Sequence, residues 1–235
     1  MLFDVDLTLV NTGGAGLRAL DSAFEELFAV PRVMAGVAPH GKTDPAIIRE
    51  IVANTDLLQK VDTSGDEGLP ENLLDQILKR YIFYLEREVA ASEHYLVLPG
   101  IMEILSEIDE SLDTLMGLAT GNIELGARIK LERGALNRFF PFGGFGSDSE
   151  DRVELVQQAG KLAEKLHGAP IAPEDTFVIG DTPLDVSAGK AAGFQTVAVA
   201  TGRSDVDSLK ASNAGLVIAD FASERGQFLS FTRMR

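Results

Sequence analysis

Two aspartates near the N-terminus, Asp4 and Asp6, have the residue type and spacing of a nucleophile and a proton carrier. Because they are two positions apart, both side chains point to the same side of an extended chain. A carboxylate can attack phosphorus and form an aspartyl-phosphate. A second carboxyl beside it can protonate the leaving alkoxide and later activate water. Single aspartates at strand ends commonly shape turns instead, so the chemical interpretation depends on what accompanies this pair.

Further polar residues follow other short apolar runs of the chain. In open parallel sheets the carboxyl ends of the strands meet at one edge, where ligands bind, so these residues are expected to converge on Asp4 and Asp6. They are Thr120, Gly121, Asn122, Asp181 and Asp185, together with Arg152 near the start of a long predicted helix. The Thr120 hydroxyl and the N–H groups after it can bind phosphate oxygens, and the forked charge of Arg152 can neutralise a transferring group.

The carboxylates gathered in this way would repel one another. Each pair costs about 4 kcal/mol at a separation of about 4 Å near a protein surface. A hard divalent cation removes this cost, and Mg²⁺ is usually held by one or two carboxylates while water and phosphate fill its other positions. We therefore expect Asp4 and Asp181 to bind Mg²⁺, with Asp185 one helical turn further on to orient them.

The pattern of elements predicts a doubly wound α/β core with a helical insertion. From about residue 98 onward, apolar runs of strand length alternate with helical patterns, which is typical of a parallel sheet covered on both faces. The predicted strands are 114–119, 142–146, 176–179, 195–200 and 216–219, and the predicted helices are 99–109, 123–132, 150–166 and 183–192. Residues 12–91 show only helical patterns, at 17–30, 45–53 and 71–90, with loops at 36–44 and 62–70. We therefore expect a core of residues 1–11 and 92–235 and a helical cap of residues 12–91.

Four segments of the chain resemble the four motifs of the haloacid dehalogenase superfamily, in order and at its spacing. They are Asp4-Val5-Asp6-Leu7-Thr8-Leu9, Thr120-Gly121-Asn122, Arg152, and Gly180-Asp181-Thr182-Pro183-Leu184-Asp185. The resemblance covers nearly the whole chain, and the inserted helices are similar to the cap of phosphoglycolate phosphatase-like members. It implies a Rossmann-like core and an Mg²⁺-dependent phosphoric monoester hydrolase.

The resemblance also implies residue roles. Asp4 would be nucleophile and Mg²⁺ ligand, and Asp6 would be acid and base as well as a ligand through its backbone carbonyl. Thr120 would bind phosphate, and Asp181 would bind the metal with support from Asp185.

Two positions depart from the family pattern. Leu7 stands where the first motif most often has glycine, which affects turn geometry but removes no reactive group. In the third motif many members carry lysine, and here Arg152 has the suitable position, whereas Lys161 lies too close to Asp181.

Lys42, in the cap segment His40-Gly41-Lys42-Thr43-Asp44, is a possible substrate contact, although a loop lysine is commonly just solvated.

Composition narrows the classes of partner. The formal charge is −15 with no cysteine, which disfavours nucleic acid and excludes thiolate metal sites. The apolar runs are shorter than the roughly 18 to 20 residues that cross a bilayer. The start MLFDVD also lacks a basic segment followed by an apolar one. We therefore expect a cytoplasmic protein with no membrane partner.

The sequence favours a phosphatase that acts on a small phosphorylated metabolite, such as phosphoglycolate or a sugar phosphate. A cap over the site would exclude water and bulky substrates. A phosphomutase of the beta-phosphoglucomutase type would share every core motif and is the main alternative. A noncatalytic sensor of a phosphate ligand is a weaker one, since a sensor needs neither a nucleophile nor an acid and base.

Overall fold

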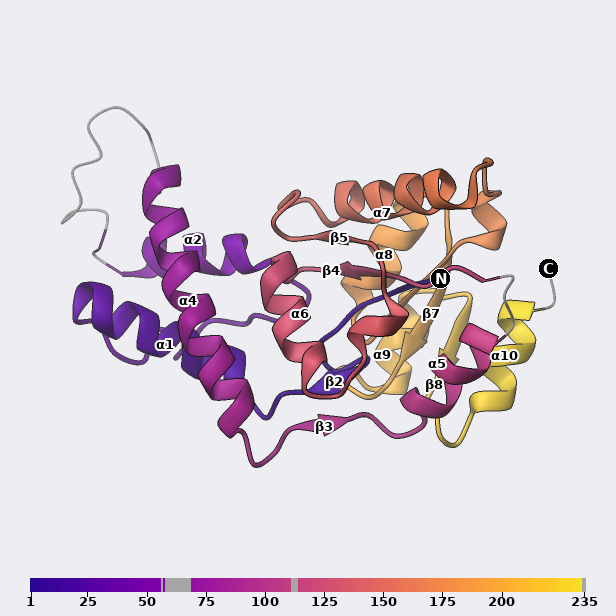
Figure 1. The fold of residues 1–235 in the computed structure, drawn as a ribbon, viewed down its shortest axis with the longest axis horizontal. Helices are drawn as coiled ribbons and strands as arrows, with labels where there is room; N and C mark the ends of the chain where they lie inside the picture. The colour runs from indigo at the N-terminus through magenta and orange to yellow at the C-terminus, as the bar shows by residue number, and fades with distance from the viewer. Residues whose placement is uncertain (56, 58–68, 111–113, 234–235) are drawn as a thin grey trace.

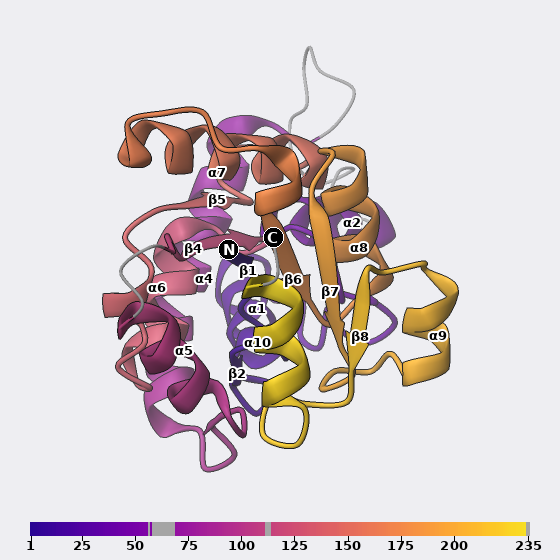
Figure 2. The same ribbon diagram turned by 90° about the vertical axis from the view of Figure 1, so that its right-hand side faces the viewer.

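The computed structural model describes residues 1–55, 57, 69–110 and 114–233. Its core is one parallel sheet of six strands in the order β5-β4-β1-β6-β7-β8 (Figures 1 and 2). The strands are β1 (Leu2–Phe3), β4 (Gly117–Thr120), β5 (Gly143–Phe145), β6 (Phe177–Gly180), β7 (Gln195–Val199) and β8 (Leu216–Ile218). The strand order reverses between β1 and its neighbours β4 and β6, which places the ends of these three strands at the crevice where open α/β sheets bind ligands.

Successive strand residues point to opposite sides of the sheet, so both faces carry apolar side chains. Helices cover both faces for this reason. Phe3 and Ile179 pack on one face in a cluster with side chains of α5 and α10, whereas Leu2 and Val178 pack on the other with side chains of α7 and α8. The core helices are α5 (Ile101–Glu110), α6 (Glu124–Glu132), α7 (Arg152–His167), α8 (Pro183–Ala191), α9 (Val206–Ala211) and α10 (Arg225–Arg233). Two short 3₁₀ turns, Asn137–Phe139 and Pro173–Asp175, complete these connections. The predicted doubly wound α/β fold is confirmed.

The helices inserted after β1 form a second hydrophobic cluster of their own. They are α1 (Ala15–Phe28), α2 (Asp44–Asn54) and α4 (Glu71–Ala91), at the left of Figure 1. Phe24, Ile48 and Tyr81 are almost fully buried among them. We propose the division into a core of 1–11 and 92–235 and a cap of 12–91, supported by this separate cluster. The expected loop at 62–70 lies largely outside the described residues.

The sequence missed several short elements. Strands β2 (Val10–Asn11) and β3 (Leu96–Val97) pair antiparallel where the chain passes between the two helical groups. Two residues on each side are too few to show a period of two. Helices α9 and α10 were also not predicted, and the strand expected from residue 114 begins at Gly117.

Leu7 adopts the left-handed conformation that its family position favours for glycine. Its φ is 58°, its N–H donates to the Val10 carbonyl at 2.8 Å, and its carbonyl accepts from the Thr201 hydroxyl at 2.6 Å. A left-handed non-glycine residue costs roughly 1 to 2 kcal/mol. The turn after Asp4 and Asp6 therefore keeps its shape at a cost in backbone energy.

Candidate active site

Asp4 and Asp181 follow neighbouring strands and meet at the same edge of the sheet. Asp4 follows β1, its N–H donates to the Ile179 carbonyl at 2.9 Å, and its side chain is buried. Asp181 follows β6 and is also buried. The loop after β7 passes so close to it that a Cβ at Gly202 would lie 1.7 Å from the Asp181 Oδ2. The sheet topology thus produces the convergence that the sequence predicts.

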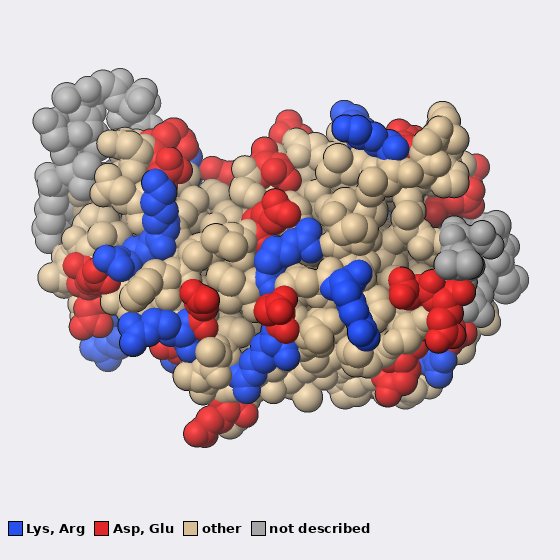
Figure 3. Space-filling model, in the orientation of Figure 1, with Lys and Arg blue, Asp and Glu red and all other residues tan. Residues whose placement is uncertain are grey.

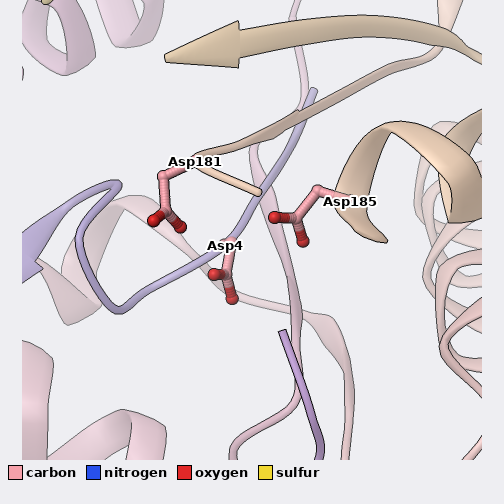
Figure 4. Close-up of side chains that lie close together, drawn as sticks. All are labelled: Asp4, Asp181 and Asp185. Carbon is pink, nitrogen blue, oxygen red and sulfur yellow. The ribbon is translucent and has the colours of Figure 1, made fainter. Parts of the chain in front are cut away.

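Asp185 joins these two aspartates from the first turn of α8. One carboxylate oxygen of each of Asp4, Asp181 and Asp185 lies within 4.8 Å of the others (Figure 4). Asp185 is held in place by its neighbours, because its Oδ2 accepts from the Thr182 N–H at 3.0 Å and from the Thr182 hydroxyl at 2.6 Å. Its Oδ1 accepts from the Arg152 guanidinium. Asp185 is therefore set to orient the cluster, whereas Asp4 and Asp181 have more freedom to bind a ligand.

The crowding of these acids changes their proton affinity. Burial raises the pKa of Asp4 to about 7, and the Asp185 carboxylate adds to the rise while Arg152 opposes it. Burial likewise raises the pKa of Asp181 to about 8, with Asp4 and Asp185 as further causes. These carboxylates would be ionised together more readily beside a cation. A buried group of carboxylate oxygens is the donor set that Mg²⁺ prefers, so the residues present fit that ion.

The predicted phosphate-binding segment begins at Thr120, the last residue of β4. Thr120 is fully buried, and its hydroxyl oxygen accepts from the Asn122 side-chain amide at 2.8 Å. The loop at Gly121 is packed against the cap, since a Cβ there would lie 2.2 Å from the Lys42 carbonyl oxygen and 3.1 Å from the Arg152 Nη1. Only glycine allows the cap, this loop and the guanidinium to approach so closely.

Arg152 reaches the site, whereas Lys161 does not line its cavity. Arg152 begins α7, lines the cavity with Asp4 and Thr120, and is joined to Asp185. Its Nε is buried and has no hydrogen-bond partner among the described residues, so one donor is left for a ligand. Lys161 lies further along the same helix and is exposed. The geometry therefore favours Arg152 as the phosphate-binding cation.

Asp6 precedes the turn at Leu7 and lines the cavity, beside a lysine that the sequence analysis missed. Lys130, on α6, is 5% exposed, and its Nζ lies 2.6 Å from the Asp6 Oδ2. The Asn122 side-chain amide donates to the same oxygen at 2.8 Å, and Lys130 also donates to the Asn122 side-chain oxygen Oδ1. The available signal was a lysine next to Leu131 and three residues after Ala127, on a helix face that is otherwise apolar.

The cap lies over these groups, and the partly open cavity between cap and core has a volume of about 440 Å³. The cap residues that line this cavity include His40, Lys42, Asp44 and Tyr81. The Asp44 carboxylate accepts from the Ile123 N–H of the core at 2.9 Å, and burial raises its pKa to about 6. Lys42, the possible substrate contact of the sequence analysis, lines the cavity, but its ammonium is paired with the Glu50 carboxylate. The volume suits a small ligand.

Comparison with known proteins identifies the class of this chain. A model of the haloacid dehalogenase-like hydrolase family matches residues 1–199 of the 235. The chain therefore belongs to the haloacid dehalogenase-like hydrolase family. The phosphoglycolate phosphatase of Pseudomonas syringae pv. tomato is 30% identical over 222 residues, which span 94% of this chain and 76% of that protein. Within the family, this chain is similar to phosphoglycolate phosphatases.

Solved structures share the fold over nearly the whole chain. A predicted phosphoglycolate phosphatase from Haemophilus somnus has a TM-score of 0.69 at 16% identity, covering 97% of this chain and 96% of that one. A candidate beta-phosphoglucomutase from Bacteroides vulgatus has a TM-score of 0.65 at 21% identity, covering 99% and 89%. At these identities the likeness establishes a common fold. The reaction has to be argued from the residues of the site.

Proposed function

We propose that this protein is an Mg²⁺-dependent phosphatase that hydrolyses a small phosphomonoester through an aspartyl-phosphate on Asp4. The observation that carries the proposal is the cluster of three buried carboxylates, Asp4, Asp181 and Asp185, of which Asp4 and Asp181 line one cavity with Thr120 and Arg152. A carboxylate nucleophile, a site for a cation and a site for phosphate are thus next to one another.

The proposed first step forms the bond from an Asp4 oxygen to phosphorus and breaks the bond from phosphorus to the substrate oxygen. Asp6 donates its proton to that leaving oxygen and becomes a carboxylate. In the second step Asp6 takes a proton from water, whose oxygen attacks phosphorus and frees Asp4. Thr120, the backbone N–H groups of Gly121 and Asn122, and Arg152 bind the phosphoryl oxygens.

Asp4, Asp181 and the backbone carbonyl of Asp6 would hold the proposed Mg²⁺, with Asp185 in support. When bound, this ion neutralises charge on the phosphoryl group and on the carboxylates around it. Arg152 offers positive charge at the same place, which supports an anionic substrate in a chain of net charge −15.

A small substrate is supported by the cavity of about 440 Å³ under the cap. Phosphoglycolate, which the name of the curated Pseudomonas relative gives as its substrate, is one member of this class, and sugar phosphates are another.

Nucleic acid is disfavoured, because basic side chains are interspersed with acidic ones on the described part of the face in Figure 3. No described helix has the length and apolar character that crossing a membrane requires. A cytoplasmic location stays a prediction.

The experiment that tests this proposal measures phosphate release from 2-phosphoglycolate, several sugar phosphates and a phosphopeptide, with Mg²⁺ and again with EDTA. We expect Mg²⁺-dependent release from a small ester and little from the peptide, without any bisphosphate activator. The Asp207→Asn variant, which changes an exposed acid on α9, is the matched control and should behave as wild type. Turnover only in the presence of a bisphosphate would indicate the mutase instead.

A further inference from the structure

Lys130 and Asn122 hold one oxygen of the Asp6 carboxylate and leave the other free. The Asp6 Oδ2 accepts from the Lys130 Nζ at 2.6 Å and from the Asn122 Nδ2 at 2.8 Å. The Asp6 Oδ1 has no hydrogen-bond partner among the described residues, and the side chain is 42% exposed where it lines the cavity. Since two donors already occupy Oδ2, Oδ1 is the oxygen available to a ligand.

Lys130 is itself fixed from several sides. It projects from α6, and its Nζ also contacts the Asn122 Oδ1, so the three polar side chains form a closed ring of contacts. The cap covers this ring: a Cβ at Gly16 would lie 3.7 Å from the Lys130 Nζ and 3.6 Å from the Tyr81 hydroxyl. A side chain that is 5% exposed and held by two hydrogen bonds has little rotational freedom.

The charge of Lys130 is maintained despite its burial. Burial alone would lower the pKa of Lys130, but the carboxylates of Asp6 and Asp44 outweigh it and hold that pKa above its usual value. A buried ammonium without partners would be strongly unfavourable, and removing a partner of a buried charge typically costs several kcal/mol. A positive charge is therefore retained beside the Asp6 carboxylate in spite of the desolvation cost.

We propose that Lys130 is the positioning residue for proton transfer by Asp6, fixing Oδ2 so that Oδ1 faces the leaving oxygen of the substrate. The inference rests on the proposed function, because it assigns a task to the acid of that reaction. Lys130 touches no reacting atom in this account. Its effect is to hold the Asp6 carboxyl in the one orientation from which its proton reaches the oxygen of the breaking bond.

This role predicts a dependence on the leaving group that a merely structural lysine would not show. An alkyl phosphate releases an alkoxide that must be protonated, whereas acetyl phosphate releases acetate, which needs no proton. In the Lys130→Met variant, kcat/KM for the preferred alkyl phosphate should fall about 100-fold, as expected for loss of general acid catalysis. For acetyl phosphate it should fall less than about fivefold. The Lys161→Met variant, at an exposed lysine, should match wild type on both substrates.

A second variant covers the case in which Lys130→Met does not fold. Lys130→Arg keeps the positive charge but replaces its compact ammonium with a wide fork, so it should disturb Asp6 and show the same selective loss, less strongly. Equal losses on both substrates in a folded variant would overturn the inference alone. If wild type hydrolyses neither substrate with Mg²⁺, the proposed phosphatase function fails and this inference fails with it.

Discussion

The Asp4→Asn variant is expected to lose hydrolysis of every phosphomonoester by a factor on the order of 10⁴ or more. Losses of this size follow removal of a nucleophile on which the other catalytic groups depend. Asparagine keeps the shape of the side chain but cannot form the aspartyl-phosphate. Phosphate release measured with saturating Mg²⁺ gives the loss, and Asp207→Asn serves as the control for an acid removed elsewhere.

The same variant should fold and, without metal, be more stable than wild type at pH 8. The pKa of Asp4 in the folded protein is about 7, above the ordinary 3.8, so the folded state binds this proton more tightly than the unfolded state. That stabilisation is complete below about pH 4 and is lost as the pH rises through about 7. Asparagine avoids the loss, and we expect a gain of roughly 1 to 3 kcal/mol at pH 8 in EDTA. An unfolded Asp4→Asn protein would contradict this account of the site's repulsion.

Removal of Mg²⁺ is expected to lower activity at least about 100-fold, since a bound metal contributes several kcal/mol to charge neutralisation in such reactions. The Asp181→Asn variant should need at least about tenfold more Mg²⁺ for half-maximal activity, because it loses one of the proposed carboxylate ligands. A titration of activity with Mg²⁺ in both proteins measures the two effects.

The affinity for Mg²⁺ should also depend on pH. Protons compete with the cation, because the pKa of Asp4 is raised to about 7 and that of Asp181 to about 8. The dissociation constant is therefore expected to rise as the pH falls from about 8.5 to 6. A dissociation constant for Mg²⁺ that is unchanged over this range, or full activity in EDTA, would exclude these two carboxylates as the metal site.

The sequence predicted the core well because its signals are local and repeated. Buried strands such as Phe177–Gly180 are short apolar runs, and each is followed by a helix with its own apolar period. The polar residues at their ends could be assigned to one edge by topology alone. Short pairings such as Val10–Asn11 with Leu96–Val97 carry no such pattern, so they were missed.

The candidate site was predicted less completely than the fold. The sequence indicates that Asp4, Asp181 and Asp185 converge, and the structure brings them together. Lys130 could not be assigned, because its partner Asp6 is 124 residues away and a lone lysine on a helix is ordinarily solvated. Lys42 lines the cavity, but its pairing with Glu50 depends on cap geometry that spacing does not reveal. Long-range contacts of this kind follow only from the assembled fold.

The most direct test of the central claim is to trap the phosphorylated protein. Wild type and Asp6→Asn would each be mixed with Mg²⁺ and acetyl phosphate, whose acetate leaves without a proton from Asp6, and then quenched in acid, and the peptide bearing a phosphoryl group identified by mass spectrometry. We predict phosphorylation at Asp4 in both proteins, in a larger fraction of Asp6→Asn because that variant cannot activate water, and none in Asp4→Asn or in EDTA. Phosphate release with no phosphoryl group on Asp4, or with the group on another residue, would contradict the account.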